Sequence, residues 1–241
     1  MKLFYAKEPN RSWAKHFWYR LARRSCFIYC KIFYRFKVTG QDNIPKQGGI
    51  VFATNHQSFI DPILVGGACK SRHPYKLARA SLWNNKILGP LISSLNAIPV
   101  ARDQADTQAV RQCISILKEG SALLVFPEGT RTTDATVGPF KPGTMLMIKR
   151  SKATVVPVSI SGAFEIWPRK QKLPKLFGKV ALHYGKPIPP EELIPMGAEK
   201  GMTFIRDIIE AKRIEMAEKL NHNTHTHSTT PQKTDQNKQN V

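Results

Sequence analysis

Cysteine, acidic residues and long apolar runs are all scarce in this sequence. The four cysteines, Cys26, Cys30, Cys69 and Cys113, form no CxxC pair and no pattern of metal ligands, so we expect free thiols and no metal site. The nearest candidate for a membrane span, residues 87–101, is shorter than the ~18 apolar residues required and contains glycine and proline. The N-terminus carries charges throughout and lacks the apolar segment of a secretory signal, so we expect no such signal.

The shortage of acidic residues makes the chain strongly basic. Lys and Arg number 37 against 17 Asp and Glu, a net charge of +20 over 241 residues. Such a balance bears on partners rather than on the fold, and nucleic acid, anionic lipid and an acidic carrier protein would all fit it. The sequence has no recognisable helix-turn-helix, zinc finger or RNA-binding signature, which argues against nucleic acid as the partner.

Residues 1–37 concentrate this charge, with ten Lys or Arg and one Glu, a local charge of +9. On a helical wheel, basic residues share one face and large apolar residues share another. We predict an amphipathic, membrane-contacting helical element, with its basic face toward anionic headgroups and its Trp and Tyr at the interface. Two questions stay open: whether it is one helix or two, and whether its apolar face instead packs on the core. The basic residues are Arg20, Arg24, Lys31 and Arg35, and the apolar ones are Trp18, Leu21, Ala22, Ile28, Tyr29, Ile32, Phe33 and Phe36.

Residues 38–220 alternate short apolar runs with amphipathic stretches, which predicts an α/β domain with a largely parallel sheet flanked by helices. Ligand sites in such sheets gather at the carboxyl ends of the strands. The polar residues 221–241, which include three histidines, predict a disordered tail without a metal function. The predicted strands are residues 49–54, 75–80, 97–100, 123–126, 154–160 and 180–184, and the predicted helices are residues 62–70, 103 or 106 to 118, 143–152 and 200–220.

One segment within this domain, Trp167–Lys179, reads WPRKQKLPKLFGK and is strongly basic. Three interpretations stay open for it: a second membrane contact, a site for an acidic carrier protein, or a solvated loop.

The string NHQSFID places His56 five residues before Asp61, directly after an apolar strand. Imidazole is the usual general base near neutral pH, and a carboxylate beside it fixes its tautomer. A loop that enters a helix can fold Asp61 back toward His56, and Pro62 suits the start of that helix. The alternative is a surface histidine and a helix-capping aspartate. Because the chain has no GxSxG elbow, a base that deprotonates the substrate directly fits better than an acyl-serine route.

A second string, FPEGTR, follows another apolar strand and places Glu128, Gly129, Thr130 and Arg131 in a turn. Arginine presents a planar fork that matches phosphate oxygens, and glycine permits a tight loop. The alternative is a polar turn with a surface ion pair. Two more cations fit an anion site: Lys141 precedes a predicted helix start, and Arg102 follows the strand at residues 97–100.

The order of five strings, NHQSFID, IPVAR, FPEGTR, FKPGT and VVPVSI, resembles the four ordered blocks of the 1-acyl-sn-glycerol-3-phosphate acyltransferase family. The likeness covers roughly residues 38–190. It implies an α/β core with an N-terminal membrane-contacting helical element. It also implies that His56 is the catalytic base and Asp61 its partner. Substrate-binding positions then match Arg102, Glu128, Gly129, Thr130, Arg131 and Lys141, and Pro157 matches a proline that shapes the acyl site.

The reaction implied by this resemblance moves a fatty acyl chain from a thioester to the sn-2 hydroxyl of 1-acyl-sn-glycerol 3-phosphate, giving phosphatidic acid. The donor would be acyl-CoA or acyl-carrier protein, and no metal or redox cofactor is expected. The protein would act in phospholipid biosynthesis as a peripheral or monotopic enzyme on the cytoplasmic face of a membrane with anionic lipids. Another lysolipid or glycerol 3-phosphate as acceptor stays open, and so does a non-enzymatic basic binder of membrane or nucleic acid, although the intact His56–Asp61 pair disfavours the binder.

Overall fold

A seven-stranded sheet forms the centre of the protein, seen here in a computed structural model that describes residues 12–100 and 107–225. The strand order is β1-β7-β6-β2-β5-β3-β4, and the central neighbours β6, β2, β5, β3 and β4 are parallel, while β7 pairs antiparallel with β6. The predicted α/β class with a largely parallel sheet is therefore confirmed. The strands are β1 (Lys37–Thr39), β2 (Ile50–Thr54), β3 (Tyr75–Arg79), β4 (Ala97–Val100), β5 (Ala122–Val125), β6 (Thr154–Ser161) and β7 (Ala181–Tyr184).

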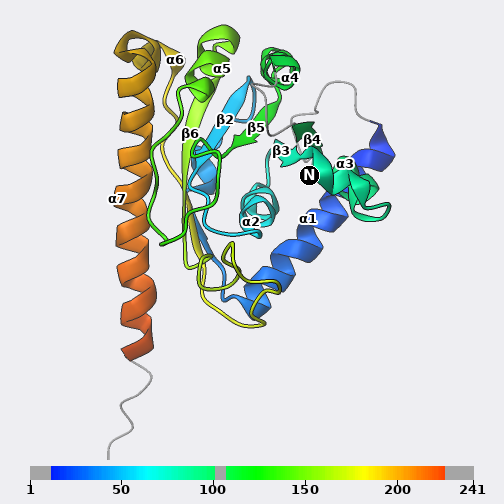
Figure 1. Cartoon of the computed structure of the whole chain (residues 1–241), viewed down its shortest axis with the longest axis vertical. Helices are drawn as coiled ribbons and strands as arrows, with labels where there is room; N and C mark the ends of the chain where they lie inside the picture. Colours follow the sequence, from blue (N-terminus) through cyan, green and yellow to red (C-terminus); the bar gives the residue numbers. More distant parts are fainter. Residues whose placement is uncertain (1–11, 101–106, 226–241) are drawn as a thin grey trace, which may run out of the picture.

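Helices cover both faces of the sheet, with α1 and α2 on one side and α4, α5 and α7 on the other (Figure 1). Short helices, α3 and α6, and three short 3-10 turns complete the connections. The helices are α1 (Trp13–Phe33), α2 (Asp61–Ala68), α3 (Leu88–Ser94), α4 (Thr107–Lys118), α5 (Gly143–Ser151), α6 (Pro190–Leu193) and α7 (Gly197–His225).

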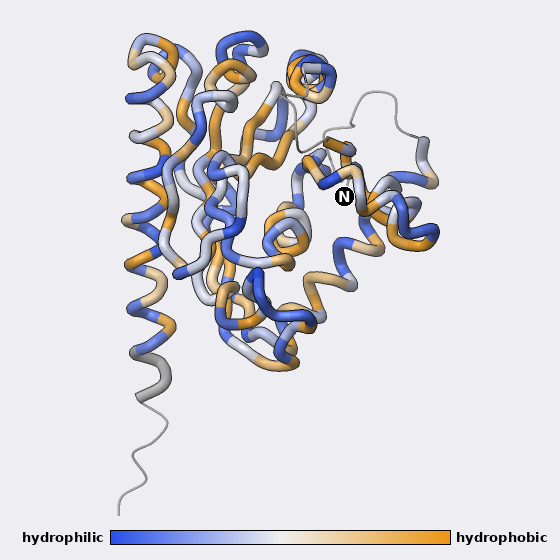
Figure 2. Tube along the Cα trace, viewed as in Figure 1, coloured by the Kyte–Doolittle hydropathy of each residue, from blue (hydrophilic) through white to orange (hydrophobic). Residues whose placement is uncertain are grey.

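The alternation of side chains along the strands divides the core in two. In β2 all five residues are buried, as expected of a strand covered on both faces. Ile50 and Phe52 pack with the α1 and α2 side, whereas Val51 and Ala53 pack with the α4, α5 and α7 side. In Figure 2 the helices around the sheet alternate hydrophobic and hydrophilic residues along their length. Phe52 lies opposite Leu124 in β5 and Val156 in β6. The pairing with β6 continues to the last residue of β2, where Thr54 lies opposite Val158.

The N-terminal element is one continuous helix, α1, so the question of one helix or two is answered. One side of α1 packs on α2 and buries Tyr19 and Cys30. The opposite side leaves large apolar side chains exposed, and we call it the outer face of α1. Packing on the core is therefore found for one side of the helix, and membrane contact by the other side stays a prediction. The outer face consists of Trp13, Phe17, Trp18, Leu21, Ile28, Tyr29 and Ile32.

Three of the labelled strands and helices, β1, α3 and α6, were not predicted, and one boundary moved. Strand β1 is only three residues long, and α3 contains Gly89 and Pro90, which usually interrupt helices but here lie in its first turn, where proline is tolerated. Helix α7 extends to His225, so the boundary drawn after residue 220 falls inside it. Within the described ranges, no helix is both long enough and apolar enough to cross a membrane.

Candidate active site

His56 and Asp61 meet at the carboxyl end of β2. Asp61 opens α2, and its Oδ2 lies 2.8 Å from Nδ1 of His56. The same oxygen accepts the backbone N–H groups of Gln57 and Ser58, each at 2.7 Å. Asp61 is fully buried, whereas the His56 side chain remains 19% exposed. The aspartate therefore holds both the imidazole and the loop that carries it, and the other ring nitrogen, Nε2, remains available for chemistry.

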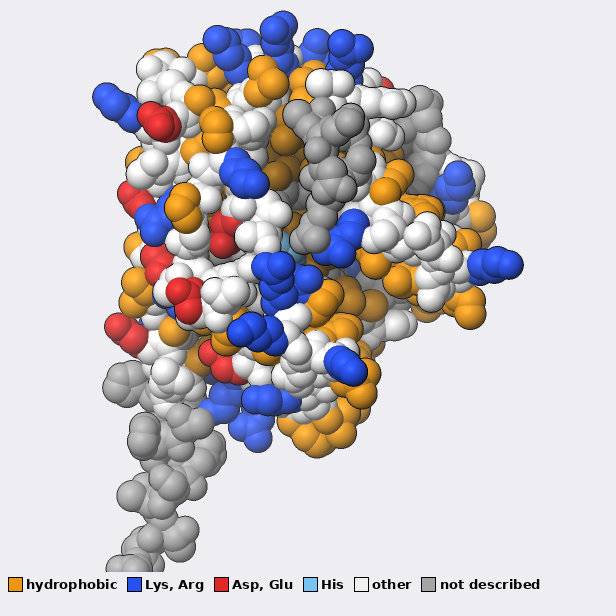
Figure 3. All heavy atoms as spheres, viewed as in Figure 1, with side chains coloured by type: hydrophobic (Ala, Val, Ile, Leu, Met, Phe, Trp, Pro, Cys, Tyr) orange, Lys and Arg blue, Asp and Glu red, His pale blue; other side chains and the backbone are white. Residues whose placement is uncertain are grey.

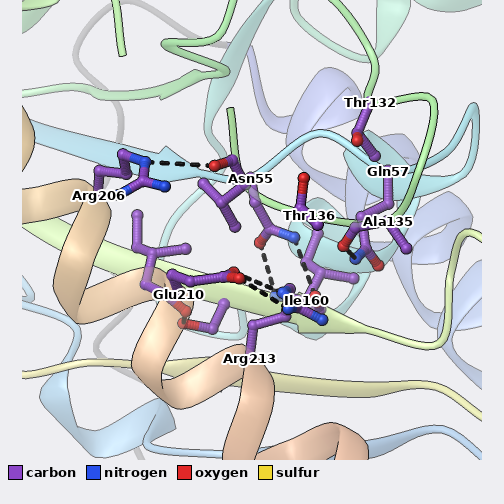
Figure 4. Close-up of polar contacts among 12 residues, drawn as sticks. Asn55, Gln57, Thr132, Ala135, Thr136, Ile160, Arg206, Glu210 and Arg213 are labelled. Atoms are coloured by element: carbon purple, nitrogen blue, oxygen red, sulfur yellow. Dashed lines mark hydrogen bonds and ion pairs between the residues drawn. The ribbon is translucent and has the colours of Figure 1, made fainter. Parts of the chain in front are cut away.

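The loop between β2 and α2 is anchored on three sides. Asn55 is fully buried and exchanges two 2.9 Å hydrogen bonds with the backbone of Ile160 in β6. Gln57 donates to the carbonyl of Ala135 at 3.0 Å, and Ser58 donates to the carbonyl of Trp167 at 2.8 Å. Figure 4 shows the Asn55–Ile160 and Gln57–Ala135 contacts. A loop fixed by this many partners presents the histidine in one orientation.

Glu128 lies in the loop that follows β5 and binds the backbone of His56. Its Oε1 accepts the backbone N–H of His56 at 2.7 Å, and its Oε2 accepts the N–H of Gly138 at 3.1 Å. The side chain is buried, and this burial raises the pKa of Glu128 to about 7, against the opposing effect of the two N–H donors. Both carboxyl oxygens thus face backbone donors of the protein itself.

The imidazole of His56 also stacks on Phe126, with ring centroids 3.9 Å apart. The loop after Phe126 closes back on the histidine, because the N–H of Thr132 donates to the carbonyl of His56 at 2.8 Å. The same loop is backed by α7, where Arg206 donates to the carbonyl of Val137 at 3.2 Å (Figure 4). The loop after β2 and the loop after β5 are thus held together by contacts in both directions.

The cations predicted to bind an anion are placed around these two loops. The guanidinium of Arg131 lies 3.3 Å above the ring of Phe59, which belongs to the His56 loop. Gly129 has a φ of +71°, and a side chain there would meet the Lys141 ammonium, so the lysine lies directly over the turn. Thr130 is exposed and accepts a 3.3 Å hydrogen bond from Arg169.

Two predicted site residues are not part of this cluster. Pro157 is buried inside β6, opposite Ala53, so it contributes to the sheet beneath the loop. Arg102 lies outside the described residues. In the part of the chain that the structure describes, no group of three or more His, Cys, Asp and Glu side chains could hold a metal ion.

Sequence reasoning did not find Phe126, Ala135, Trp167 or Arg169 as supports of the site. Phe126 opens the FPEGTR string and Trp167 opens the segment WPRKQKLPKLFGK, but nothing in either string indicates that its first residue contacts the His56 loop. The contacts of Ala135 use only its backbone carbonyl, so no residue type could reveal them.

A family model described as "Acyltransferase" matches residues 35–161, more than half of the chain. This range contains His56, Asp61 and the loop from Phe126 to Gly138.

Similar proteins and one solved structure agree with this match. A 1-acyl-sn-glycerol-3-phosphate acyltransferase of Bacillus subtilis is 27% identical over 186 residues, covering 76% of this chain and 89% of that protein. A chloroplastic 1-acyl-sn-glycerol-3-phosphate acyltransferase of Arabidopsis thaliana is 28% identical, and the match covers 75% of this chain but only 50% of that protein. The crystal structure of the 1-acyl-sn-glycerophosphate (LPA) acyltransferase PlsC from Thermotoga maritima superposes with a TM-score of 0.72 at 26% identity, covering 84% of this chain and 81% of that one.

Proposed function

Because this chain belongs to the acyltransferase family, we propose that it transfers a fatty acyl chain to the sn-2 hydroxyl of 1-acyl-sn-glycerol 3-phosphate, giving phosphatidic acid. The observation that carries the proposal is the 2.8 Å contact between His56 Nδ1 and Asp61 at the end of β2. It supplies an oriented base in a chain whose relatives carry this activity in their names.

The reaction begins when Nε2 of His56 takes the proton of the acceptor hydroxyl. The hydroxyl oxygen forms a bond to the thioester carbonyl carbon, and backbone N–H groups stabilise the oxyanion that develops. Collapse of this intermediate breaks the carbon–sulfur bond, and the imidazolium gives its proton to the departing sulfur. Asp61 stabilises the imidazolium and keeps Nδ1 protonated, so that Nε2 begins each cycle as the acceptor. These steps use acid–base chemistry alone and require no metal or redox cofactor.

The phosphate of the acceptor binds to the cations beside the histidine. Arg131 precedes Thr132, whose N–H donates to the His56 carbonyl, and its guanidinium lies over the ring of Phe59, which belongs to the same loop as His56. Lys141 adds a second charge above the turn at Gly129. Thr130 extends the same polar surface. Arg102 is assigned to the substrate on its match to the second sequence block alone. Glu128 acts through the His56 backbone rather than on the substrate, because both of its oxygens accept protein N–H groups.

The acyl donor is acyl-CoA or acyl-carrier protein, whose thioester would lie on the Nε2 side of His56. Pro157 shapes the acyl site from beneath, through its place in β6.

The enzyme works at the cytoplasmic face of a membrane that contains anionic lipid, as a peripheral or monotopic protein. The outer face of α1 supports this, because it exposes tryptophan and aliphatic side chains next to Arg24 and Lys31.

An acceptor panel tests the proposal. Purified full-length protein receives 1-acyl-sn-glycerol 3-phosphate, other lysophospholipids or glycerol 3-phosphate, each with acyl-CoA and with acyl-carrier protein. We expect the highest kcat/KM for 1-acyl-sn-glycerol 3-phosphate. A higher value for glycerol 3-phosphate or for another lysolipid would assign the protein to a different acceptor.

A further inference from the structure

Residues 167–179, which we call the basic loop, expose apolar and basic side chains together. Leu173, Leu176 and Phe177 are 74%, 57% and 67% exposed. No acidic residue interrupts the loop, and four of its five basic side chains are exposed. Exposed leucines between lysines are costly in water and favourable at a lipid surface, where the apolar tips insert and the ammonium groups meet headgroups. The basic residues are Arg169, Lys170, Lys172, Lys175 and Lys179.

The basic loop is fixed to the C-terminal end of α1. The ring of Phe177 packs on Phe33 with centroids 5.8 Å apart, and the N–H of Gly178 donates to the carbonyl of Phe33 at 3.1 Å. Figure 1 shows the loop, in yellow, beside the lower end of α1, and Figure 3 shows exposed hydrophobic and basic side chains gathered in this region. Ile28, Tyr29 and Ile32 of the outer face of α1 are therefore continued by the exposed tips of the loop.

The basic loop is also bound to both loops of the active site. The carbonyl of Trp167 accepts hydrogen bonds from the Ser58 hydroxyl at 2.8 Å and from the Phe59 N–H at 3.4 Å, and the two aromatic rings lie 4.9 Å apart. Arg169 donates to Thr130. A surface that holds this loop would thus lie beside His56 and Arg131.

From these contacts we propose that the basic loop is a second membrane-docking element, which seats the entrance of the active site on anionic lipid. This inference rests on the proposed function, because it gives the site a lipid acceptor. The exposed apolar side chains of the loop continue those of the outer face of α1, which favours a bilayer as the partner. An acidic carrier protein would require the basic charge but not the exposed Leu173 and Leu176. Helix α1 supplies attachment, and the basic loop sets the orientation of the site toward the lipid.

The test compares two loop variants with a matched control. One variant is Leu173→Asn with Leu176→Asn, and the other is Lys172→Gln with Lys175→Gln; Phe177 is kept because it packs on α1. The control is Leu146→Asn with Ile214→Asn, on α5 and α7 across the sheet, where both side chains are also exposed, at 47% and 44%. Flotation uses vesicles of equal parts phosphatidylcholine and phosphatidylglycerol, and kinetics use a long-chain acceptor in these vesicles and a short-chain acceptor dissolved as monomers.

We expect each loop variant to lower vesicle partitioning by about tenfold or more, given typical contributions of basic and apolar groups at a membrane. Turnover of the long-chain acceptor should fall with it, while turnover of the dissolved acceptor should stay within about twofold of the unaltered protein. Flotation equal to that of the control would overturn the proposal. A loss seen with acyl-carrier protein but not with acyl-CoA, at normal flotation, would also overturn it and assign the loop to the carrier. If the unaltered protein acylates neither acceptor, the proposed function fails, but flotation still decides the docking.

Discussion

The Glu128 carboxylate accepts a 2.7 Å hydrogen bond from the backbone N–H of His56, although 72 residues separate them in sequence. This contact joins the FPEGTR turn to the histidine loop. Since the buried carboxyl also holds Gly138, it fixes the spacing between the base and the loop that carries Arg131.

Protonation of Glu128 should make the stability of the protein depend on pH. Burial raises the folded-state pKa to about 7 from an ordinary value of 4.5, so the folded protein holds a proton that the unfolded chain releases between these values. The free energy of unfolding should therefore be highest below about pH 4.5 as far as this group is concerned. It should fall by roughly 1–3 kcal/mol as pH rises through 7.

Denaturant unfolding of wild type and Glu128→Gln at a series of pH values measures this. The Glu128→Gln protein should be less stable than wild type at low pH, because one of the two N–H donors loses its acceptor. Its free energy of unfolding should, however, change less between about pH 4.5 and pH 7. Parallel curves would show that Glu128 does not titrate in this window.

Replacement of His56 by alanine should nearly abolish acyl transfer and leave the fold intact. The side chain is partly exposed, and the loop is held by Asn55, Ser58 and Asp61, none of which needs the imidazole. Loss of a general base costs roughly 10²–10⁴-fold in kcat. Circular dichroism and thermal unfolding provide the control, and near-normal turnover in folded protein would rule out the direct-attack mechanism.

Asp61→Asn should lower kcat by more than it raises KM. The amide can still accept the N–H groups of Gln57 and Ser58 through its oxygen, but it no longer stabilises an imidazolium. Asp61→Ala is the matched comparison, because it removes the loop contacts as well and should lower stability in addition to rate. Equal kinetics for wild type and Asp61→Asn would mean that the pair serves structure alone.

Arg131→Ala should weaken use of the phosphate-bearing acceptor. A lost charge-assisted contact removes about 1.5–3 kcal/mol, or roughly tenfold to a hundredfold in kcat/KM. Arg131→Lys keeps the charge but loses the planar fork over Phe59, so an intermediate loss is expected. A phosphate-free acceptor analogue should be used equally well by all three proteins, and a parallel loss with this analogue would make Arg131 a structural residue.

The outer face of α1 should give vesicle binding a salt-resistant part. Trp13→Ser, Ile28→Ser and Ile32→Ser change side chains that are 75%, 56% and 65% exposed, so the fold should tolerate them, and the salt-resistant part of binding should shrink to what the apolar side chains of the basic loop supply. Arg24→Gln with Lys31→Gln should instead reduce the salt-sensitive part, of which the basic loop keeps a share. Deleting the whole helix is a poor test, because Tyr19 and Cys30 belong to the core. Flotation over a salt series measures both, and unchanged profiles would place the anchor elsewhere.

The strand and helix positions around the site were predictable because they rest on local signals. Continuous apolar runs located β2, β5 and β6, and Pro62 marked the start of α2. These signals allowed a His56–Asp61 contact but left a surface histidine and a helix-capping aspartate as the alternative, and the structure has the contact.

The rest depends on contacts between distant segments. The hydrogen bonds that His56 N–H donates to Glu128 and that the Ser58 hydroxyl donates to Trp167 each use a backbone group, which every sequence supplies equally. The direction of β7 could not be read either, because an apolar run of four residues has the same alternation whether it lies parallel or antiparallel to β6. The division of α1 into two apolar sides required knowing where α2 lies.

The side chain of Asn55 determines where the chain leaves the sheet before His56. Strand β2 ends at Thr54, yet the carboxamide of the next residue gives one hydrogen to the Ile160 carbonyl and takes one from its N–H, as a peptide group of a further strand residue would. The side chain thus imitates one more rung of the ladder while the main chain is already turning away. The backbone is released from the sheet one residue before His56, at a point dictated by β6. A carboxamide is required, because a carboxylate at this position could only accept and would face the Ile160 carbonyl with a like charge.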